Sequence, residues 1–515
     1  MKKLTFLMAA LLVAMTGCQK EPAGNGTEAA EGKVYMSFSV HAVDTKSATD
    51  GTGDSNSDAT PETEVGSDAE NKISTVQVIL DHSTTDNFIE SSEVTLSGGL
   101  TNYTATFKKG SFTPGEYKVY IVCNDKLSGS SFDSDAVKSI TTDGAGELNI
   151  STDNNFLMTN ARTASPINIT DAMLTAGMSP ATPIQLGTIE VERTVARFDY
   201  AAENADHLYT IKTGEKTKIK LSHAALVNVS KEAYYFRRVY DGSTTVGGVE
   251  TSTNWVEDTD WTIKTTLKGT WNNATAEGRF NYPLMGAARE WIDLTALSVD
   301  DNIDGSITDT HPDPDVVNSQ EYHFLSYVSE NTLPNAEAQI NGLSTGVVFK
   351  GYLTTEDGTA LLTGADANDY KYVFANTFYG SFSEMNAAYG TGTTDFKAAF
   401  DQIKATPTDL AKCVAAGFTV YTPDANKNYE VLYYYWNRHN DNYNSKNMGT
   451  MEFAVVRNNV YKLMVNSISK YGHPSNTAGD PDPIDPSNPD EEAEYYFRVY
   501  VKVLPWTVRV NNIEF

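Results

Sequence analysis

Apolar and polar residues alternate most regularly near the end of the chain, from Tyr495 to Val510. This period of two predicts β-strand structure. The alternation changes register at Pro505, and proline cannot donate to a β-ladder, so the pattern predicts two consecutive short strands. The first apolar row consists of Tyr495, Phe497, Val499, Val501 and Val503, and the second consists of Trp506, Val508 and Val510.

A segment with five prolines, residues 471–494, separates this tail (495–515) from the rest of the chain. Such a composition is typical of an extended linker. A tethered strand pair is unstable alone, because burying about ten apolar side chains contributes roughly 15–25 kcal/mol. Ordering the residues of the tail costs about 30 kcal/mol. The tail therefore requires an apolar groove with free strand edges, either in its own body or in another copy of the chain.

Another isolated strand is predicted at Val34–Val43. Its apolar positions alternate with polar ones and are Val34, Met36, Phe38 and Val40. The next residues, Asp44–Lys72, are acidic and almost without large apolar side chains, so we expect a long exposed loop. This strand would therefore stand apart from the body that follows it.

The remaining segments favour an all-β protein with minor helix. Tyrosine and threonine favour strands, and the chain contains 28 Tyr. Strand-like runs begin at Ile73, and one helix is predicted over Thr394–Ala405. We expect an N-terminal β-domain over 47–232 and a C-terminal β-domain over 233–470, each long enough to bury a core.

The first residues have the features of an export signal, with Lys2 and Lys3 before an apolar run too short to span a membrane. We expect a signal peptide over 1–17. A cysteine at its end, Cys18, resembles a bacterial lipobox, in which the thiol is lipidated; an ordinary signal peptide is the alternative. The net charge of −28 argues against nucleic acid as a partner and favours a secreted, self-repelling surface.

Candidate chemistry is sparse. Asp300, Asn302 and Asp304 match the first positions of a calcium loop, but its twelfth residue is His311 rather than Glu, so an acidic surface turn is the alternative. The histidines are scattered, and no nucleophile–base pair or phosphate loop is evident. We therefore predict no enzyme, no firm metal site and no cofactor beyond a weak structural Ca²⁺ candidate.

Two further features concern packing. Cys123 and Cys413 stand in apolar or helical surroundings and are predicted to be buried free thiols rather than a disulfide. The aromatic run "YEVLYYYW" (Tyr429–Trp436) is a predicted strand with one face in the core. A glycan-stacking surface is the alternative for that run.

Several blocks of the chain together indicate a family. They are "VERTVARFDY" (191–200), "LSYVSEN" (325–331), "VVRNNVYKLMVNSIS" (455–469) and "VLPWTVRVNNIEF" (503–515), with the lipobox and the linker. These blocks resemble the fimbrillins, the lipoprotein pilins of Bacteroidales fimbriae, and most of all the shaft subunit of the short fimbriae. The resemblance implies two transthyretin-like β-sandwich domains and export to the cell surface as an outer-membrane lipoprotein.

The resemblance also implies a mode of assembly. A protease removes the first strand of such subunits, and the C-terminal strand pair of another subunit fills the groove. This contact does not close on itself, so it produces a filament. The implied propeptide is 18–46, with removable strand Val34–Val43 and a cut between Lys46 and Ser47. No arginine precedes Arg162, so a lysine-specific or trypsin-like protease is required, or a cut elsewhere in the loop.

The implied partners are other copies of the chain, anchor and tip subunits, and host or bacterial ligands reached through the fimbria during adhesion and biofilm formation. Two alternatives remain. The chain is a fimbrial anchor or tip subunit, or it is a surface lipoprotein that binds a host ligand or glycan without polymerising.

Overall fold

The fold is mostly β, with several sheets and a few short helices, as the sequence predicts. The computed structural model describes residues 32–42, 64–84, 88–97, 102–128, 132–143, 146–152, 154–160, 166–239, 245–246, 249–250, 256–261, 264, 278–284, 289–297, 322–361, 369–440, 442, 444, 446–449, 451–475, 484–491 and 497–507. None of the helices in these ranges is long and apolar enough to cross a membrane.

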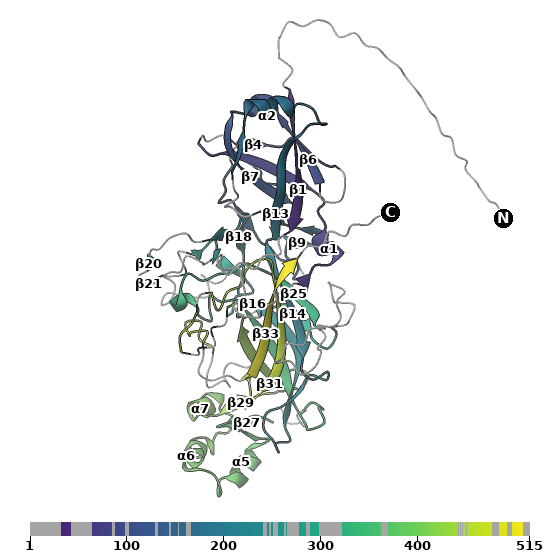
Figure 1. The fold of residues 1–515 in the computed structure, drawn as a ribbon. Helices are drawn as coiled ribbons and strands as arrows, with labels where there is room; N and C mark the ends of the chain where they lie inside the picture. Colours follow the sequence, from purple (N-terminus) through teal and green to yellow (C-terminus); the bar gives the residue numbers. More distant parts are fainter. Residues whose placement is uncertain are drawn as a thin grey trace, which may run out of the picture.

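The N-terminal body is one sheet of nine strands (Figure 1). Its main path runs β4-β3-β7-β11-β13-β1-β6-β5, and β12 pairs with β7. The strands are β1 (Lys33–Ala42), β3 (Val76–His82), β4 (Phe88–Glu90), β5 (Glu93–Leu96), β6 (Asn102–Lys108), β7 (Gly115–Cys123), β11 (Met158–Thr159), β12 (Ile167–Ile169) and β13 (Ile184–Arg193). A short helix, α2 (Asp171–Ala176), lies at the end of this body.

The second body contains two larger sheets. One has the order β2-β33-β31-β14-β25, with β2 (Glu64–Val65), β33 (Phe497–Thr507), β31 (Asn459–Ile468), β14 (Val195–Ala202) and β25 (His323–Ser329). The other has the order β15-β16-β26-β30-β32, with β24 on β16; these are β15 (Leu208–Thr210), β16 (Lys218–Val227), β24 (Ile292–Asp293), β26 (Gly346–Thr354), β30 (Glu430–Trp436) and β32 (His473–Pro474). The ring centroids of Tyr200 in β14 and Phe349 in β26 lie 5.8 Å apart, so the two sheets share a core.

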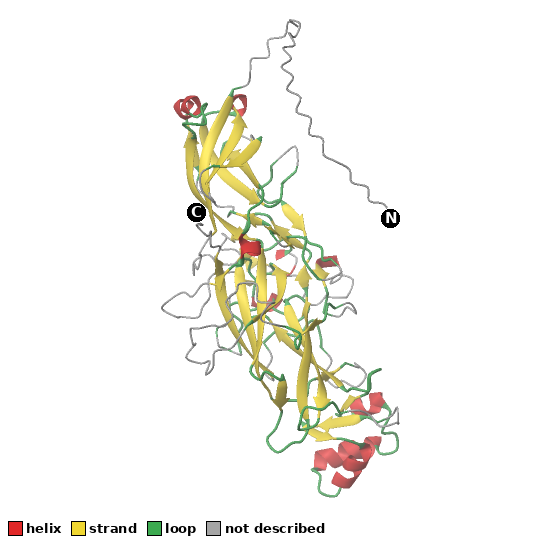
Figure 2. Ribbon diagram, turned by 90° about the vertical axis from the view of Figure 1, so that its right-hand side faces the viewer, coloured by secondary structure: helices red, strands yellow, loops and turns green. Residues whose placement is uncertain are grey.

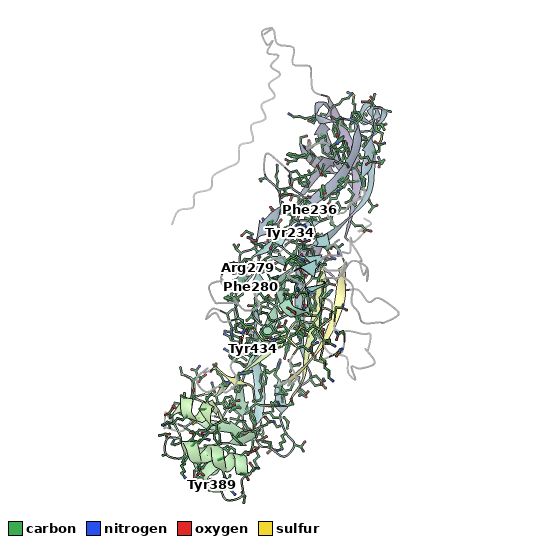
Figure 3. The ribbon with its side chains drawn as sticks, turned by 90° about the vertical axis from the view of Figure 1, so that its left-hand side faces the viewer. Tyr234, Phe236, Arg279, Phe280, Tyr389 and Tyr434 are labelled. Carbon is green, nitrogen blue, oxygen red and sulfur yellow. The ribbon has the colours of Figure 1, made fainter. Side chains whose placement is uncertain are left out.

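A small helical unit forms the far end of the molecule (Figure 2). It combines β27 (Lys371–Phe374), β28 (Thr377–Tyr379) and β29 (Thr419–Tyr421) with α5 (Phe382–Ala388), α6 (Thr394–Ile403) and α7 (Leu410–Ala415). The predicted helix at 394–405 is confirmed by α6, whose Phe396, Phe400 and Ile403 are buried in this unit's own core. Tyr389 marks this end in Figure 3.

A short ladder connects the two bodies. β8 (Val137–Ser139) of the N-terminal part pairs with β18 (Glu232–Tyr234), and Phe236 packs on Tyr120 at 4.8 Å near this junction (Figure 3). The other short pairs are β9 (Ser151–Thr152) with β10 (Asn155–Phe156), β17 (Val229–Ser230) with β23 (Phe280–Asn281), β19 (Arg238–Val239) with β22 (Val256–Glu257), and β20 (Thr245–Val246) with β21 (Val249–Glu250).

Strand membership changes at Thr194. β13 ends at Arg193 in the first sheet, and β14 begins at Val195 in the second body, although the sequence between them has no turn residues. The strands from β14 to β17 therefore belong with C-terminal strands, and the boundary predicted near residue 232 falls inside the second body. Alternation identified these strands, but it does not specify which sheet a strand joins.

Both described cysteines are buried and free, as predicted. Burial raises the pKa of Cys123 to about 12 and that of Cys413 to about 11.

The thiolate is the reactive form of a cysteine, so a Cys18→Ser chain should not react with a thiol reagent at pH 8 until it is unfolded. Absorbance of the released reagent anion measures this, and two equivalents should appear only in denaturant. Rapid labelling of the native chain would contradict the expected burial.

Candidate assembly site

β1 is an interior strand of the N-terminal sheet. It pairs in parallel with β13 from Met36 to Ala42 and antiparallel with β6 from Lys33 to Ser39. Every second side chain enters the core, as the alternation predicts, and Val34, Met36, Phe38 and Val40 are all at most 2% exposed. Phe38 stacks on Tyr103 of β6 with ring centroids 5.6 Å apart.

Removing β1 would therefore open a groove between β13 and β6. Full burial contributes about 1.5–3 kcal/mol for each large apolar side chain, or about 6–12 kcal/mol for four. Whole domains are stable by about 5–15 kcal/mol. An emptied N-terminal body would need a replacement strand to stay folded.

The chain after the long loop is anchored separately from β1. Ser67 and Glu70 form a capping box at α1 (Asp68–Asn71): Glu70 N–H donates to Ser67 Oγ, and Ser67 N–H donates to Glu70 Oε2. Such a box satisfies two backbone donors at the helix start. Glu70 is nevertheless fully buried, because its carboxylate also binds side chains of the second body.

Three side chains of the second body and of β13 bind this turn. Tyr327 Oη donates to Glu70 Oε1 at 2.7 Å, and Arg197 Nη1 lies 3.2 Å from the same oxygen. Arg193 Nε donates to the Glu70 carbonyl at 3.1 Å. Burial, and then the Glu70 charge, raises the pKa of Tyr327, which therefore stays a neutral donor. Burial lowers the pKa of Arg193 to about 10.

This anchor sits directly downstream of the predicted cleavage loop. A cut within that loop would leave residues 64–71 attached to β14 and β25. Among the described residues, β1 would keep its contacts with its sheet partners and two further backbone bonds. In those bonds, Tyr35 N–H donates to Gly177 O at 2.8 Å, and Lys109 N–H donates to Gly32 O at 2.7 Å.

The tail strand lies in its own body in this chain. β33 pairs antiparallel with β31 from Phe497 to Pro505, which is one of the two receptors predicted from the sequence. β2 pairs with only Trp506 and Thr507 on the opposite edge. The predicted break at Pro505 is wrong, since β33 continues to Thr507; proline is tolerated where a strand has an open edge. In Figure 1 the end of β33 lies at the junction of the two bodies.

The described parts of the predicted linker are docked rather than free. His473 and Pro474 form β32 on β30, and Asp490 N–H donates to Gln339 O at 3.0 Å. Asp490 also accepts from Ser344 Oγ, and Glu491 pairs with Arg438 at 2.8 Å. Proline has no backbone N–H to donate, but carbonyls of this segment still accept hydrogen bonds: Pro486 O accepts from Gly342 N–H, and Asn488 O accepts from Asn341 N–H. The described linker residues therefore contact the second body up to Glu491.

The remaining predicted residues fall into two groups. In β30, Val431 and Tyr433 lie in the main core, and Leu432, Tyr434 and Trp436 pack in a second cluster, so both faces are used in packing rather than in a glycan platform. The other group lies outside the described residues: Cys18, Lys46, Ser47, Asp300, Asn302, Asp304, Tyr495, Val508 and Val510. Among the described residues, no cluster of His, Cys, Asp or Glu could hold a metal ion.

Fold and site together define a mostly-β structural protein with an interior N-terminal strand and a C-terminal strand on its own sheet. Two family models match it. The model described as major fimbrial subunit protein (FimA) covers residues 35–194 and ends where strand membership changes. The model described as major fimbrial subunit protein type IV, fimbrillin, C-terminal, covers residues 426–512 and includes β30, β31 and β33. The chain belongs to the Bacteroidales fimbrillin family.

Similar solved structures include a cell adhesion protein from Parabacteroides distasonis (12% identity, 93% of this chain and 99% of that chain, TM-score 0.40). A fimbrilin (FimA) from Porphyromonas gingivalis is 13% identical, with coverage of 92% and 98% and a TM-score of 0.38. The tip fimbrial protein Mfa3 of the same organism is 11% identical, with coverage of 92% and 100% and a TM-score of 0.33. No curated protein sequence matches the chain.

The family assignment establishes the general role. The protein is a non-enzymatic fimbrial subunit of the cell surface, and it assembles with other fimbrial subunits.

Proposed function

We propose that this fimbrillin is a shaft subunit that polymerises by strand exchange. In this scheme it is exported as a lipoprotein modified at Cys18, and a protease cuts between Lys46 and Ser47. The released strand Val34–Val43 vacates the groove between β13 and β6, and the tail of another copy enters it. Its two bodies would be transthyretin-like sandwiches, and the filament would support adhesion.

One observation carries this proposal: β1 is an interior strand with four buried apolar side chains, yet its chain connection to the rest of the protein runs through the predicted loop after Val43. Strand addition between two sheet edges supplies main-chain hydrogen bonds, while alternate side chains fill pockets. The first apolar row of the tail offers Phe497, Val499, Val501 and Val503, which repeat the spacing of Val34, Met36, Phe38 and Val40. A tail that fills another copy's groove gives an open filament rather than a closed dimer.

The loop chemistry allows a direct test. Lys46 is the only Lys or Arg between Lys33 and Lys72, so trypsin has one site in the whole segment that joins β1 to the anchored turn. Exposed polar loops are the preferred sites of proteolytic nicking. Brief trypsin treatment of the purified chain should produce an N-terminus at Ser47, followed by concentration-dependent ladders on a denaturing gel run without boiling.

The matched variant is Lys46→Gln, which removes the trypsin site and changes nothing in the described sheets. It should remain monomeric after identical treatment. Ladders from the Lys46→Gln chain would contradict the cleavage requirement. Native surface filaments whose subunits still begin at lipidated Cys18 would favour the anchor role instead.

A further inference from the structure

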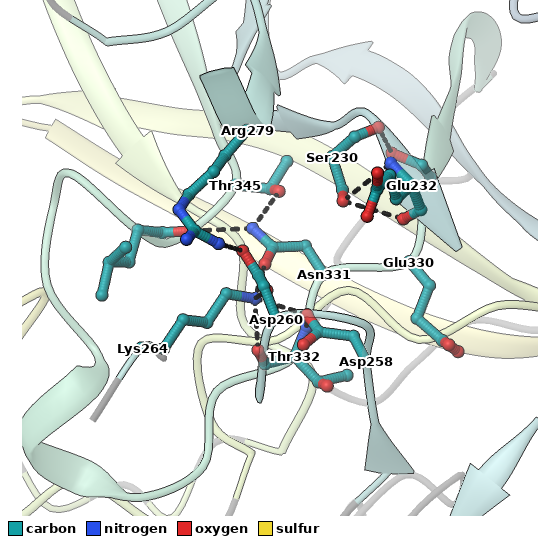
Figure 4. A network of polar contacts seen from close by, with 12 residues as sticks. Ser230, Glu232, Asp258, Asp260, Lys264, Arg279, Glu330, Asn331, Thr332 and Thr345 are labelled. Atoms are coloured by element: carbon teal, nitrogen blue, oxygen red, sulfur yellow. Dashed lines mark hydrogen bonds and ion pairs between the residues drawn. The ribbon is translucent and has the colours of Figure 1, made fainter. Parts of the chain in front are cut away.

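A buried lysine in the second body has an unusual set of neighbours (Figure 4). Lys264 is 0% exposed, and its Nζ contacts four oxygens. Asp260 Oδ1 lies at 2.8 Å, Asn331 Oδ1 at 2.7 Å and the Thr332 carbonyl at 2.7 Å, while Asp258 Oδ2 is in direct contact. A buried ammonium is expensive unless it is paired, so the two carboxylates account for its charge. The amide of Asn331 is not needed for that purpose.

Asn331 is held in one orientation. Its Nδ2 donates to Leu343 O at 2.8 Å and to Thr345 Oγ1 at 2.9 Å, so its carbonyl oxygen faces Lys264. A C=O bond is about 1.23 Å long, so the Asn331 amide carbon lies at most about 4 Å from Lys264 Nζ. Reacting atoms in a near-attack arrangement lie about 3–3.5 Å apart. A small movement would therefore bring the amine onto the carbon.

Asp258 has the position and the protonation behaviour of a proton shuttle. It is 2% exposed, its Oδ2 contacts Lys264 Nζ and accepts from Thr332 N–H, and its Oδ1 has no hydrogen-bond partner among the described residues. Burial raises the pKa of Asp258 to about 8. Burial lowers the pKa of Lys264, but the adjacent Asp258 and Asp260 outweigh it and raise that pKa, so the amine starts as an ammonium. Asp258, whose pKa lies near neutrality, can take a proton from this ammonium and give one back.

The surroundings exclude water from this group. Asp258 follows β22 and lies between Val256 and Trp261, which pack with Met451, Ala454 and Val456 in one apolar cluster. Asn331 pairs through its backbone with Val455, which lies in the same segment as that cluster. A water-excluded site favours amide formation over hydrolysis.

We propose that Lys264 and Asn331 form an intramolecular amide (isopeptide) bond, with Asp258 as the proton shuttle. Lys264 Nζ first passes a proton to Asp258, which gives a neutral amine and a neutral acid. The amine attacks the Asn331 amide carbon, and an N–C bond forms. Asp258 then gives its proton to Nδ2, so the C–Nδ2 bond breaks, the C=O bond re-forms and ammonia leaves. The Asp258 carboxylate takes the second proton from the attacking nitrogen and ends as the neutral acid. No oxidant, metal or cofactor is required.

The bond would close the chain between two residues 67 positions apart. Asn331 is separated from the end of β25 by Glu330 alone, so the link would tie the segment around Lys264 to the sheet that also holds β33. Both described cysteines are free, so the amide bond would give this subunit an internal covalent cross-link that does not depend on a disulfide.

Peptide mass mapping of the full-length chain tests the proposal, and neither lipidation nor loop cleavage affects the relevant peptides. The expected result is a branched tryptic peptide that joins the segments of Lys264 and Asn331. Its mass should equal the sum of the two linear peptide masses minus the mass of one ammonia. Trypsin should not cut after Lys264 in this species. Separate linear peptides in the wild-type chain would overturn the proposal and leave a buried ion pair, whereas a Lys264–Asp258 link with loss of water would overturn the choice of Asn331.

Two variants separate the roles. Asp258→Asn should leave the two segments unlinked, while Asp260→Asn, on the same loop and also in contact with Lys264, should still yield the branched peptide. A link that persists in Asp258→Asn would overturn the shuttle. Because either variant could fail to fold, Lys264→Arg provides a further comparison: the boiled wild-type chain should migrate faster on a denaturing gel than Lys264→Arg, since a closed loop is more compact.

Discussion

Deletion of residues 495–515 is expected to abolish the polymer ladders that form after cleavage at Lys46. The groove left by β1 loses about 6–12 kcal/mol of apolar burial, and only a segment with four alternating apolar side chains restores it. The deletion chain should still be cut by trypsin, and size-exclusion chromatography should show monomers with a tendency to aggregate. Ladders of wild-type yield from this chain would exclude a donor role for the tail.

A shorter deletion, 508–515, tests the part of the second apolar row that follows Trp506. It removes Val508 and Val510 and keeps β33 intact. Burial of two valines contributes about 3–6 kcal/mol, which corresponds to a subunit contact weaker by about 10²–10⁴-fold. The polymer should therefore shorten strongly without loss of the folded monomer.

Matched point variants distinguish a groove contact from a general effect of the tail. Val508→Asp places a charge on the predicted apolar face, and Arg509→Asp places the same residue on the opposite face. We expect the first to behave like the 508–515 deletion and the second to form normal ladders, because successive strand residues point to opposite sides. Equal effects of both would indicate that net charge, not groove filling, limits assembly.

The elements themselves were largely predictable from alternation, and their partners were not. Val34–Val43 and the tail were recognised as strands because apolar side chains recur at every second position, and α6 was recognised from its helical spacing. Whether β33 pairs with its own β31 or with another copy depends on edges that the pattern does not encode. The same reason explains Thr194, where an uninterrupted strand pattern passes from one sheet to another.

The buried polar groups were missed for a different reason. Glu70 stands in an acidic loop, and composition assigns such a residue to solvent. The Ser67–Glu70 spacing of a capping box was a local signal that could have identified the helical turn. Lys264 and Asn331 have no such signal, because their contact joins positions far apart in the sequence, and only the folded chain brings them together.

Glu70→Ala is expected to lower the free energy of unfolding by about 1–3 kcal/mol, since it removes the acceptor of the buried Tyr327 hydroxyl and one of the two carboxylates on Arg197. Arg197 would keep its paired contacts with Asp199 at 2.9 Å but lose its link to α1, and the Tyr327 hydroxyl would lose its acceptor. The midpoint of denaturant unfolding, followed by tyrosine fluorescence, measures the change. A neutral isostere, Glu70→Gln, retains the shape and should cause a smaller loss.

The comparison variant is Lys126→Ala, which removes a surface ion pair with Glu90 whose side chains are 66% and 34% exposed. Exposed pairs contribute about 0–1 kcal/mol, so this variant should unfold almost as the wild type does. If Glu70 also anchors the chain downstream of the cleavage loop, amide exchange at Asn71, which donates to Ser67 O at 3.0 Å, should accelerate in Glu70→Ala and stay slow in Lys126→Ala. Equal midpoints and equal exchange in the two variants would mean that the Glu70 contacts do not hold residues 64–71, and would contradict the separate anchor.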